Sequence, residues 1–421
     1  MDRLFHMENR RKLYEEMLPH SMLLIFSGEE VRKTNDEFYP FFADRNFVYL
    51  TGLDCKNAVL MATKDGDGET LERLYLLPPD PMAERWTGRR VQPGEAQEVS
   101  GVKEIRYTDA FASDVHTILA GGHYREMGWD IRHLYLDLFR AEPSDRDRPA
   151  QNFLALAGRE YPFVRVENAN RILRRLRLIK TPEEIAALRR AEEITGKGIL
   201  AMMHAARPGI YEYQLKAEFD RAIGQYGPEG PGFPSIISAG ENNFCIHYYS
   251  YRGQAKDGDM VLNDVGAQWD GHIADVSRGW PVNGHFSERQ KLLFECALAT
   301  SNHMFDMIRP GMDMAEVDRE IRRYNAEKLV EAGVMKHPEE VGTYMWHGGA
   351  HHIGYDVHDV VERPGKIAPN MVFCVDVGIY HEAWGIGFRL EDNCLVTEGG
   401  CENLSAAIPR TVKDIEAEIG G

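Results

Sequence analysis

The chain lacks the features that mark several large classes of protein. It has no run of about 18 or more apolar residues, so no membrane-spanning helix is expected. Its first residues, MDRLFHMENRRKLYEEMLPH, are charged and contain no apolar segment of the secretory type. No GxGxxG or GxxxxGK motif follows a predicted strand, so nucleotide binding has no support. These absences favour a cytoplasmic protein with no membrane partner.

The chain also lacks an excess of positive charge and any regular spacing of its cysteines. The 421 residues carry a net charge of −17, which argues against nucleic acid or an anionic membrane as a partner. Bound metal would neutralise part of this acidity. The six cysteines have no metal-knuckle spacing, so we expect them to be reduced and mostly buried in the core.

The length predicts two domains, which we assign to residues 1–170 and 171–421. The first is predicted to be α/β, with a helix at Met7–Met17. An aromatic cluster that includes Tyr39, Pro40 and Phe47 is expected to pack in its core rather than to bind a ligand. The predicted strands are Met22–Phe26, Asn46–Leu50, Ala58–Met61, Leu71–Leu77 and Ile131–Leu138.

A repeated tripeptide indicates how the second domain is organised. Thr181, Pro182 and Glu184 form a helix-start signal, and the helix that follows runs into Arg-Pro-Gly at 207–209. A second predicted helix runs into the same tripeptide at 309–311. The pattern predicts two similar α+β halves related by a pseudo-twofold axis, with a site between them.

Residues 261–278, VLNDVGAQWDGHIADVSR, predict a β-hairpin that turns at Asp270-Gly271. A two-residue turn there pairs Trp269 with His272 and Asp264 with Ser277. Asp275 then lies diagonally from Asp264 on the same face, at about 7–8 Å between Cα atoms. Two carboxylates that converge inside an apolar hairpin are costly unless a cation lies between them.

Three later segments carry further candidate ligands. WHGGAHHIGYDVHDV is a glycine-rich stretch that holds four histidines. MVFCVDVGIY is an apolar strand with Asp376 at its centre, and GIGFRLEDNCLVTE places Arg389 and Glu391 on one face of another. A carboxylate inside such a strand needs a partner or a metal. The candidate metal ligands are therefore Asp264, Asp275, His351, Asp376 and Glu391.

Four carboxylates and an imidazole suit two divalent ions that prefer oxygen ligands. Mn²⁺ is the leading candidate, with Co²⁺, Fe²⁺ and Zn²⁺ left open. Two such ions with a bridging hydroxide would attack a carbonyl at neutral pH. Asp275 and Glu391 are the predicted bridging ligands, and His247 or His358 would stabilise the oxyanion.

This pattern resembles the pita-bread metallopeptidases, a group that contains methionine aminopeptidase, prolidase and aminopeptidase P. The resemblance to aminopeptidase P covers nearly the whole chain, including ERWTGRRV, SAGENNFCIHYY and HGGAHHIGYDVHDV. It implies a creatinase-type N-terminal α/β domain, an α+β pita-bread catalytic domain and a dinuclear, usually manganese, centre. It also implies a homo-oligomer, either a dimer or a tetramer.

The resemblance implies roles for individual residues. The five candidate ligands match the family's ligand positions, and His247 and His358 match its substrate histidines. His347 and Arg389 would lie beside the site and bind substrate. Asp36 and Trp86 are similar to positions that reach the active site of a neighbouring subunit in family tetramers.

One position departs from the family pattern. Where the family has Glu-Pro-Gly, this chain has Asp376-Val377-Gly378. The family's glutamate is a ligand and the general base, and aspartate is shorter by one CH₂. A displacement of about 1 Å at a reacting group can cost ~100-fold in rate.

The leading hypothesis is a metal-dependent aminopeptidase that removes the first residue from peptides with proline in second position. Metal-bound hydroxide would attack the carbonyl, and Asp376 would shuttle the proton. Prolidase, which cleaves Xaa-Pro dipeptides, is an alternative. A catalytically impaired binding or scaffold protein is another, because of Asp376. A metal-free creatinase-like hydrolase has the least support.

Overall fold

The computed structural model describes residues 1–120, 130–363 and 365–420. The chain divides into two compact units, Met1–Leu176 and Arg177–Gly421, whereas the sequence placed the boundary at 170. Within the described ranges, no helix combines the length and the apolar content that crossing a membrane requires.

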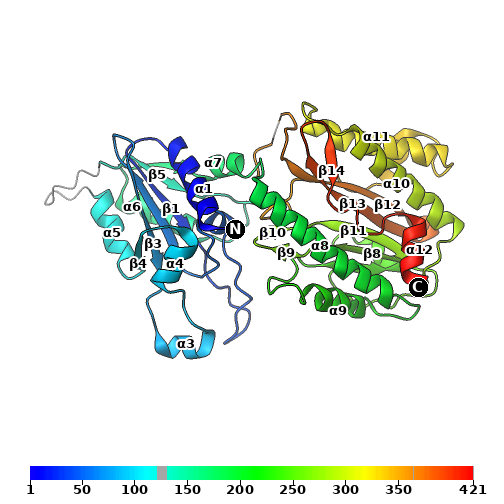
Figure 1. Cartoon of the computed structure of the whole chain (residues 1–421), viewed down its shortest axis with the longest axis horizontal. Coiled ribbons are helices and arrows are strands. Elements are labelled where there is room, and N and C mark those ends of the chain that lie inside the picture. The colour runs from blue at the N-terminus through cyan, green and yellow to red at the C-terminus, as the bar shows by residue number, and fades with distance from the viewer. Residues whose placement is uncertain (121–129, 364, 421) are drawn as a thin grey trace. The chain divides into compact units, whose positions relative to one another are not determined.

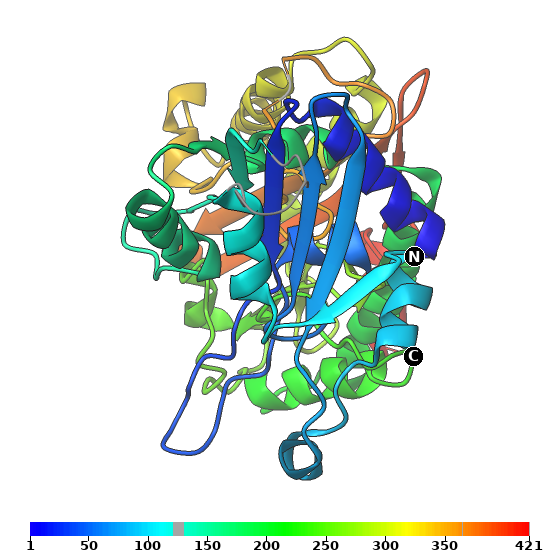
Figure 2. The same ribbon diagram turned by 90° about the vertical axis from the view of Figure 1, so that its left-hand side faces the viewer.

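The N-terminal unit is built on a six-stranded mixed sheet, in the order β4-β3-β2-β1-β5-β6 (Figures 1 and 2). Neighbouring strands are parallel in the pairs β1–β5, β5–β6 and β3–β4 and antiparallel in the other two. The strands are β1 Ser21–Phe26, β2 Val59–Lys64, β3 Thr70–Leu76, β4 Glu104–Tyr107, β5 His133–Leu136 and β6 Arg165–Asn168. The helices are α1 Arg3–Glu16, α2 Arg45–Thr51, α3 Pro81–Thr87, α4 Pro93–Ser100, α5 Phe111–Leu119, α6 Pro149–Glu160 and α7 Asn170–Leu176.

Helices cover both faces of this sheet, so its strands are apolar on both sides. Met22 and Leu24 of β1 pack with α5 and α6 in one cluster. Leu23 and Ile25, which point to the opposite face, are also fully buried. In Figure 2 the blue helices α1 and α4 lie on one side of the strands, and the cyan helix α5 and the green helix α6 lie on the other. This two-sided cover confirms the predicted α/β architecture.

Two local predictions in this unit are wrong. Asn46–Leu50, predicted as a strand, lies in α2, because the Asp44 carboxylate accepts hydrogen bonds from the first backbone N–H groups and caps the helix. The aromatic cluster is only partly in the core. Phe47 is buried, but Pro40 is exposed and Tyr39 is 53% exposed, where the Lys33 ammonium lies over its ring.

The second unit is built on an antiparallel sheet in the order β12-β13-β11-β8-β7, with β14 paired to β13 (Figure 1). The strands are β7 Ile236–Ala239, β8 Met260–Val265, β9 Gln268–Trp269, β10 His272–Ile273, β11 Val276–Pro281, β12 Val372–His381, β13 Ile386–Val396 and β14 Cys401–Asn403. The helices are α8 Pro182–Ala205, α9 Glu212–Ile223, α10 Glu288–Met307, α11 Met314–Glu331 and α12 Val412–Gly420. Short 3₁₀ turns lie at η1 Gly240–Phe244, η2 Pro338–Thr343 and η3 Glu382–Trp384.

The helices of this unit follow the predicted repeat. Arg207-Pro208-Gly209 joins α8 to α9, and Arg309-Pro310-Gly311 joins α10 to α11. Both glycines have positive φ, +87° and +91°, which a side chain would oppose. The start of α8 is the predicted capping box, in which Thr181 and Glu184 each bond the other's backbone N–H. The order of elements therefore confirms the two α+β halves.

The side chains of β12 alternate between the apolar core and a polar face. Phe373, Val375, Val377 and Ile379 join the large apolar cluster that includes residues of α8 and α10. The residues between them, Cys374, Asp376, Gly378 and Tyr380, must point to the opposite face. This opposite face is where the candidate ligands gather.

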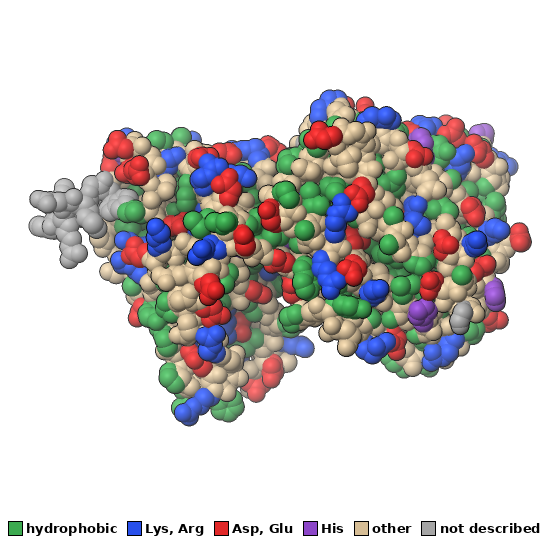
Figure 3. Space-filling view, viewed as in Figure 1, with side chains coloured by type: hydrophobic (Ala, Val, Ile, Leu, Met, Phe, Trp, Pro, Cys, Tyr) green, Lys and Arg blue, Asp and Glu red, His purple; other side chains and the backbone are tan. Residues whose placement is uncertain are grey.

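The cysteines are less buried than expected. Cys296, Cys374 and Cys394 are buried, whereas Cys55 and Cys401 are half-buried and Cys245 is exposed. All six are free thiols, as expected. Acidic and basic side chains are interspersed on the face shown in Figure 3, so the negative charge is not gathered into one patch there.

A buried acid on α8 predicts a pH dependence of stability. Glu192 is 2% exposed, and burial, with the charge of Asp392, raises its pKa from 4.5 to about 8. Between these values the folded chain keeps a proton that the unfolded chain releases. The free energy of unfolding should therefore fall as pH rises through this window.

Glu192→Gln should remove that fall, so the variant gains stability over the parent protein as pH rises from about 5 to 8. Urea unfolding at several pH values measures the difference. Glu193→Gln is the control, because Glu193 is an exposed neighbour paired with Arg190 and should leave the pH dependence unchanged. An equal pH dependence in Glu192→Gln and the parent would contradict the assignment.

Candidate metal centre

The hairpin has the predicted register. Trp269 pairs with His272, and Asp264 of β8 pairs with Ser277 of β11. Asp270 and Gly271 both have positive φ, 51° and 79°, as a two-residue turn of the type I′ class requires. The turn therefore fixes which side chains of the two long strands share a face.

A row of polar side chains crosses four adjacent strands of the sheet. Asp264 on β8 pairs with Ser277 on β11, Ser277 pairs with Glu391 on β13, and Glu391 pairs with Asp376 on β12. Directly paired residues point to the same face of a sheet. Three of the five predicted ligands therefore lie in one line, and the Ser277 hydroxyl between them donates to Glu391 Oε2 at 2.8 Å.

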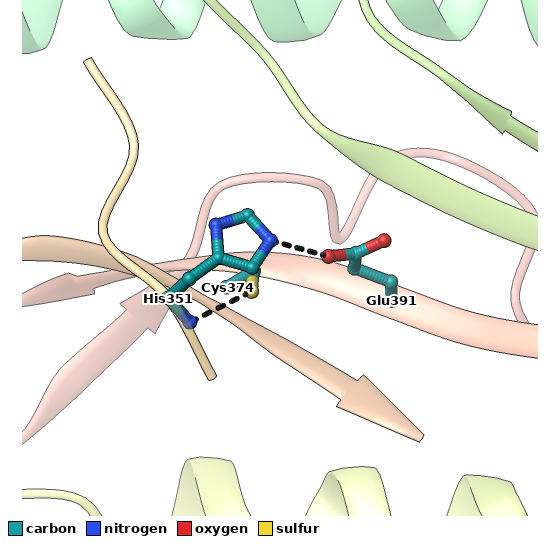
Figure 4. A group of neighbouring side chains, drawn as sticks. All are labelled: His351, Cys374 and Glu391. Atoms are coloured by element: carbon teal, nitrogen blue, oxygen red, sulfur yellow. Dashed lines mark hydrogen bonds and ion pairs between the residues drawn. The ribbon is translucent and has the colours of Figure 1, made fainter. Parts of the chain in front are cut away.

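Asp275 and His351 complete two groups of potential ligand atoms. Asp264, Asp275 and Glu391 form one group, and His351, Cys374 and Glu391 form the other, with ligand atoms within 4.8 Å of one another in each. His351 Nε2 lies 3.4 Å from Asp275 Oδ2. The same nitrogen lies 3.7 Å from Glu391 Oε1 (Figure 4). Glu391 is common to both groups, which suits a bridging carboxylate.

The histidine segment is held along the outer edge of β12. The backbone N–H of Asp376 donates to the Gly349 carbonyl at 2.8 Å, and that of Cys374 donates to the His351 carbonyl at 2.9 Å. A Cβ on Gly349 would lie 2.8 Å from atoms of Ile321, so a side chain there would push the segment away. This pairing aims the His351 ring across the strand edge at the carboxylates.

The electrostatics of the cluster fit a divalent cation. Burial and the nearby carboxylate of Glu391 raise the pKa of Asp275 well above its ordinary value. Burial and Asp376 raise the pKa of Glu391 to about 7. Among the described residues, Asp264 Oδ1, Asp275 Oδ1 and Asp376 Oδ1 are buried without a hydrogen-bond partner. Cations would supply both the missing charge and the missing partners.

Asp376 is the ligand candidate that stands apart. Its Oδ2 lies 3.1 Å from Nδ1 of His347, and it belongs to neither group of ligand atoms among the described residues. Burial opposes its ionisation, but the charges of His347 and Arg389 outweigh this and lower the pKa of Asp376. In turn, burial lowers the pKa of His347, but Asp376 outweighs this and raises it to about 9. Asp376 is therefore an ionised carboxylate held by a histidine.

Tyr380 links His347 to Arg389 beside the site, and the sequence prediction missed it. Its hydroxyl accepts a hydrogen bond from Arg389 at 2.9 Å and lies 3.1 Å from His347 Nε2. Arg389 also donates to Asp264 Oδ2 at 2.8 Å. The period-two alternation from Asp376 could have identified Tyr380, since it is four residues on along the same strand.

The two candidate substrate histidines are exposed beside the cluster. The His358 ring stacks on the ring of His351 at 3.9 Å between centroids. Desolvation of the ring by the groups packed around it, together with the neighbouring His351, lowers the pKa of His358 to about 4, so it is neutral at pH 7. His247 follows Ile246, whose carbonyl accepts hydrogen bonds from Arg389. Both rings are accessible to a peptide.

Asp36 and Trp86 belong to the N-terminal unit. Asp36 is exposed in the loop before α2, and Trp86 is 84% exposed on α3. An indole this exposed contributes little packing to the unit that carries it.

A face of buried carboxylates with histidines at its rim offers the donor set of a hydrolase-type divalent metal centre. Residues 186–398 match metallopeptidase family M24, and residues 6–125 match the aminopeptidase P N-terminal domain. The chain therefore belongs to the M24 metallopeptidases, in the group that carries the aminopeptidase P N-terminal domain.

Relatives over the full length agree with this assignment. The chain is 32% identical to the Xaa-Pro aminopeptidase of Escherichia coli strain K12, covering 97% of this chain and 96% of the relative. Among solved structures, a Bacillus anthracis protein assigned to aminopeptidase P superposes with a TM-score of 0.95 at 33% identity, covering 100% and 99% of the two chains. Aminopeptidase P of E. coli, solved with the inhibitor Pro-Leu, superposes with a TM-score of 0.89 at 30% identity, covering 100% and 98%.

Proposed function

We propose that this protein releases the first residue from peptides whose second residue is proline. The observation that carries the proposal is the line of Asp264, Glu391 and Asp376 across the sheet, with Asp275 and His351 against it. The names of the full-length relatives supply the substrate class.

Asp264, Asp275, His351 and Glu391 would hold two divalent cations, with Asp376 as the fifth ligand. When bound, these ions activate water and polarise the scissile carbonyl. We propose Mn²⁺ as the native metal, because four of the five donors are carboxylates. A Zn-substituted aminopeptidase P of E. coli is among the structural relatives, so Zn²⁺ belongs in the same test.

The chain's own residues would move the proton and hold the substrate. Asp376 is ionised and accepts the proton of the attacking water, then passes it to the proline nitrogen that leaves. His247 and His358, both exposed at the rim, hydrogen-bond the developing oxyanion. The carboxylates of the centre bind the free amine of the substrate.

His347 and Arg389 would fix the geometry around the peptide. His347 bonds Asp376, and Arg389 bonds Asp264 and Tyr380, so each orients a carboxylate of the centre. Asp36 and Trp86 would contact substrate in the site of a neighbouring subunit of a homo-oligomer, a dimer or tetramer. We further propose a cytoplasmic location.

The test compares an Xaa-Pro-Xaa tripeptide with an Xaa-Pro dipeptide, each with added Mn²⁺. We expect release of the first residue from the tripeptide, and far slower cleavage of a tripeptide with alanine in place of proline. Cleavage of the dipeptide alone would identify a prolidase instead. A purified protein that binds no divalent metal would overturn both assignments and favour a binding or scaffold role.

A further inference from the structure

A second polar row lies beside the first on the same face of the sheet. Cys374 on β12 pairs with Asn393 on β13, two residues along from the Asp376–Glu391 pair. The Asn393 side chain then bonds Asp275, donating to its carbonyl at 2.6 Å and accepting from its N–H at 3.0 Å. The thiol of Cys374 therefore shares a face and a row with a proposed metal ligand.

The sulfur lies at ligand distance from two other donors. Cys374 Sγ, a His351 ring nitrogen and a Glu391 carboxylate oxygen all lie within 4.8 Å of one another (Figure 4). Two ligands of one metal ion, each about 2.0–2.3 Å from it, can be no more than roughly twice that distance apart. The separations are of this order, so the three donors form a candidate site for one ion.

One backbone contact of the sulfur also fits a metal-bound thiolate. The backbone N–H of His351 donates to Cys374 Sγ at 3.2 Å, which would stabilise negative charge on the sulfur. Cys374 is 0% exposed, so the sulfur is shielded from solvent oxidants. No feature of the spacing between cysteines in the sequence reveals this contact, because the two other donors come from distant segments.

We propose that Cys374 is a sulfur ligand that gives this centre affinity for thiophilic divalent ions at the position bounded by His351 and Glu391. This inference rests on the proposed metal centre. Sulfur donors select softer cations such as Co²⁺, Zn²⁺ and Cd²⁺, whereas Mn²⁺ gains little from them. On binding, the thiol proton leaves to solvent and the thiolate forms the metal–sulfur bond. Cys374 thus sets which metals the centre accepts.

The test is metal binding by the full chain, measured without substrate. The metal-free protein is loaded with Co²⁺ or Cd²⁺, and the sulfur-to-metal charge-transfer band is recorded in the near ultraviolet. Affinities for Zn²⁺ and Mn²⁺ are measured by competition with a chelator. Cys374→Ser removes the sulfur and keeps a small polar side chain. Cys394→Ser is the matched control, since Cys394 is equally buried in β13 and pairs with Phe373, a residue on the opposite face.

We expect the band in the parent protein and in Cys394→Ser and its loss in Cys374→Ser. Affinity for Zn²⁺ should fall in Cys374→Ser by at least the roughly 10- to 100-fold that loss of an outer-shell partner causes, while affinity for Mn²⁺ changes little. Two results would overturn the inference and leave the proposed peptidase function intact. One is full Co²⁺ binding by the parent protein without the sulfur-to-metal band, and the other is a band that survives in Cys374→Ser. Failure to bind any divalent ion would overturn both.

Discussion

Glu391→Gln should cost the protein both bound metal and activity. Glu391 is common to the two groups of ligand atoms, so its loss weakens both metal positions together. A bound divalent ion contributes several kcal/mol to the transition state, which corresponds to a fall of about 10³-fold or more in kcat/KM. Metal content by mass spectrometry and kcat/KM on an Xaa-Pro-Xaa tripeptide measure the two effects.

The same substitution should stabilise the metal-free fold. The Glu391 carboxylate contributes to the raised pKa of Asp275, which reports repulsion between the two carboxylates. Removing one charge relieves that repulsion, so urea unfolding in a chelator should give a higher free energy of unfolding for Glu391→Gln than for the parent. Glu402→Gln is the control, because Glu402 is half-buried on β14, outside the cluster, and pairs with Arg189. Two tightly held metal ions in Glu391→Gln would contradict the bridging role.

The second large effect is expected from substitution of Asp376. Asp376→Asn keeps the size of the side chain and removes its basicity, so we expect kcat to fall about 10²- to 10⁴-fold. Because Asp376 raises the pKa of His347 to about 9, the ring should also titrate at lower pH in this variant. Nuclear magnetic resonance of the His347 ring across pH measures that change independently of activity. An unchanged kcat in Asp376→Asn would remove Asp376 from the mechanism.

Asp376→Glu tests the departure from the family pattern. The aspartate is held by His347 and lies outside both groups of ligand atoms, and glutamate is longer by one CH₂. We expect Asp376→Glu to bind metal more tightly and to raise kcat, by up to about 100-fold. A slower Asp376→Glu variant would mean that β12 is already adjusted to the shorter side chain.

Much of the site could be predicted from short-range patterns. The Asp270-Gly271 turn has one favoured geometry, and that geometry alone is enough to pair Asp264 with Ser277. A carboxylate in the centre of an apolar strand is expensive, which identified Asp376 and Glu391 as residues that need a partner. The helix start at Thr181 is likewise a local signal that the structure confirms.

Other features depended on contacts that no local pattern encodes. Asn46–Leu50 is rich in residues that favour strands, but the cap at Asp44 made it helical. Tyr39 was expected in the core, but it lies in a loop where a cation covers the ring. In each case a neighbouring side chain outweighed the intrinsic preference of the segment.

The sequence alone determined the five candidate donors first predicted and their alternation within each strand, because both follow from residue type and from the period of a β-strand. The tertiary structure decided that β13 lies between β11 and β12, and therefore that Glu391 stands between Ser277 and Asp376. It also brought His351 and Cys374 together along the edge of β12. Strand order depends on the packing of residues far apart in the chain, and no turn or period in a single segment specifies it.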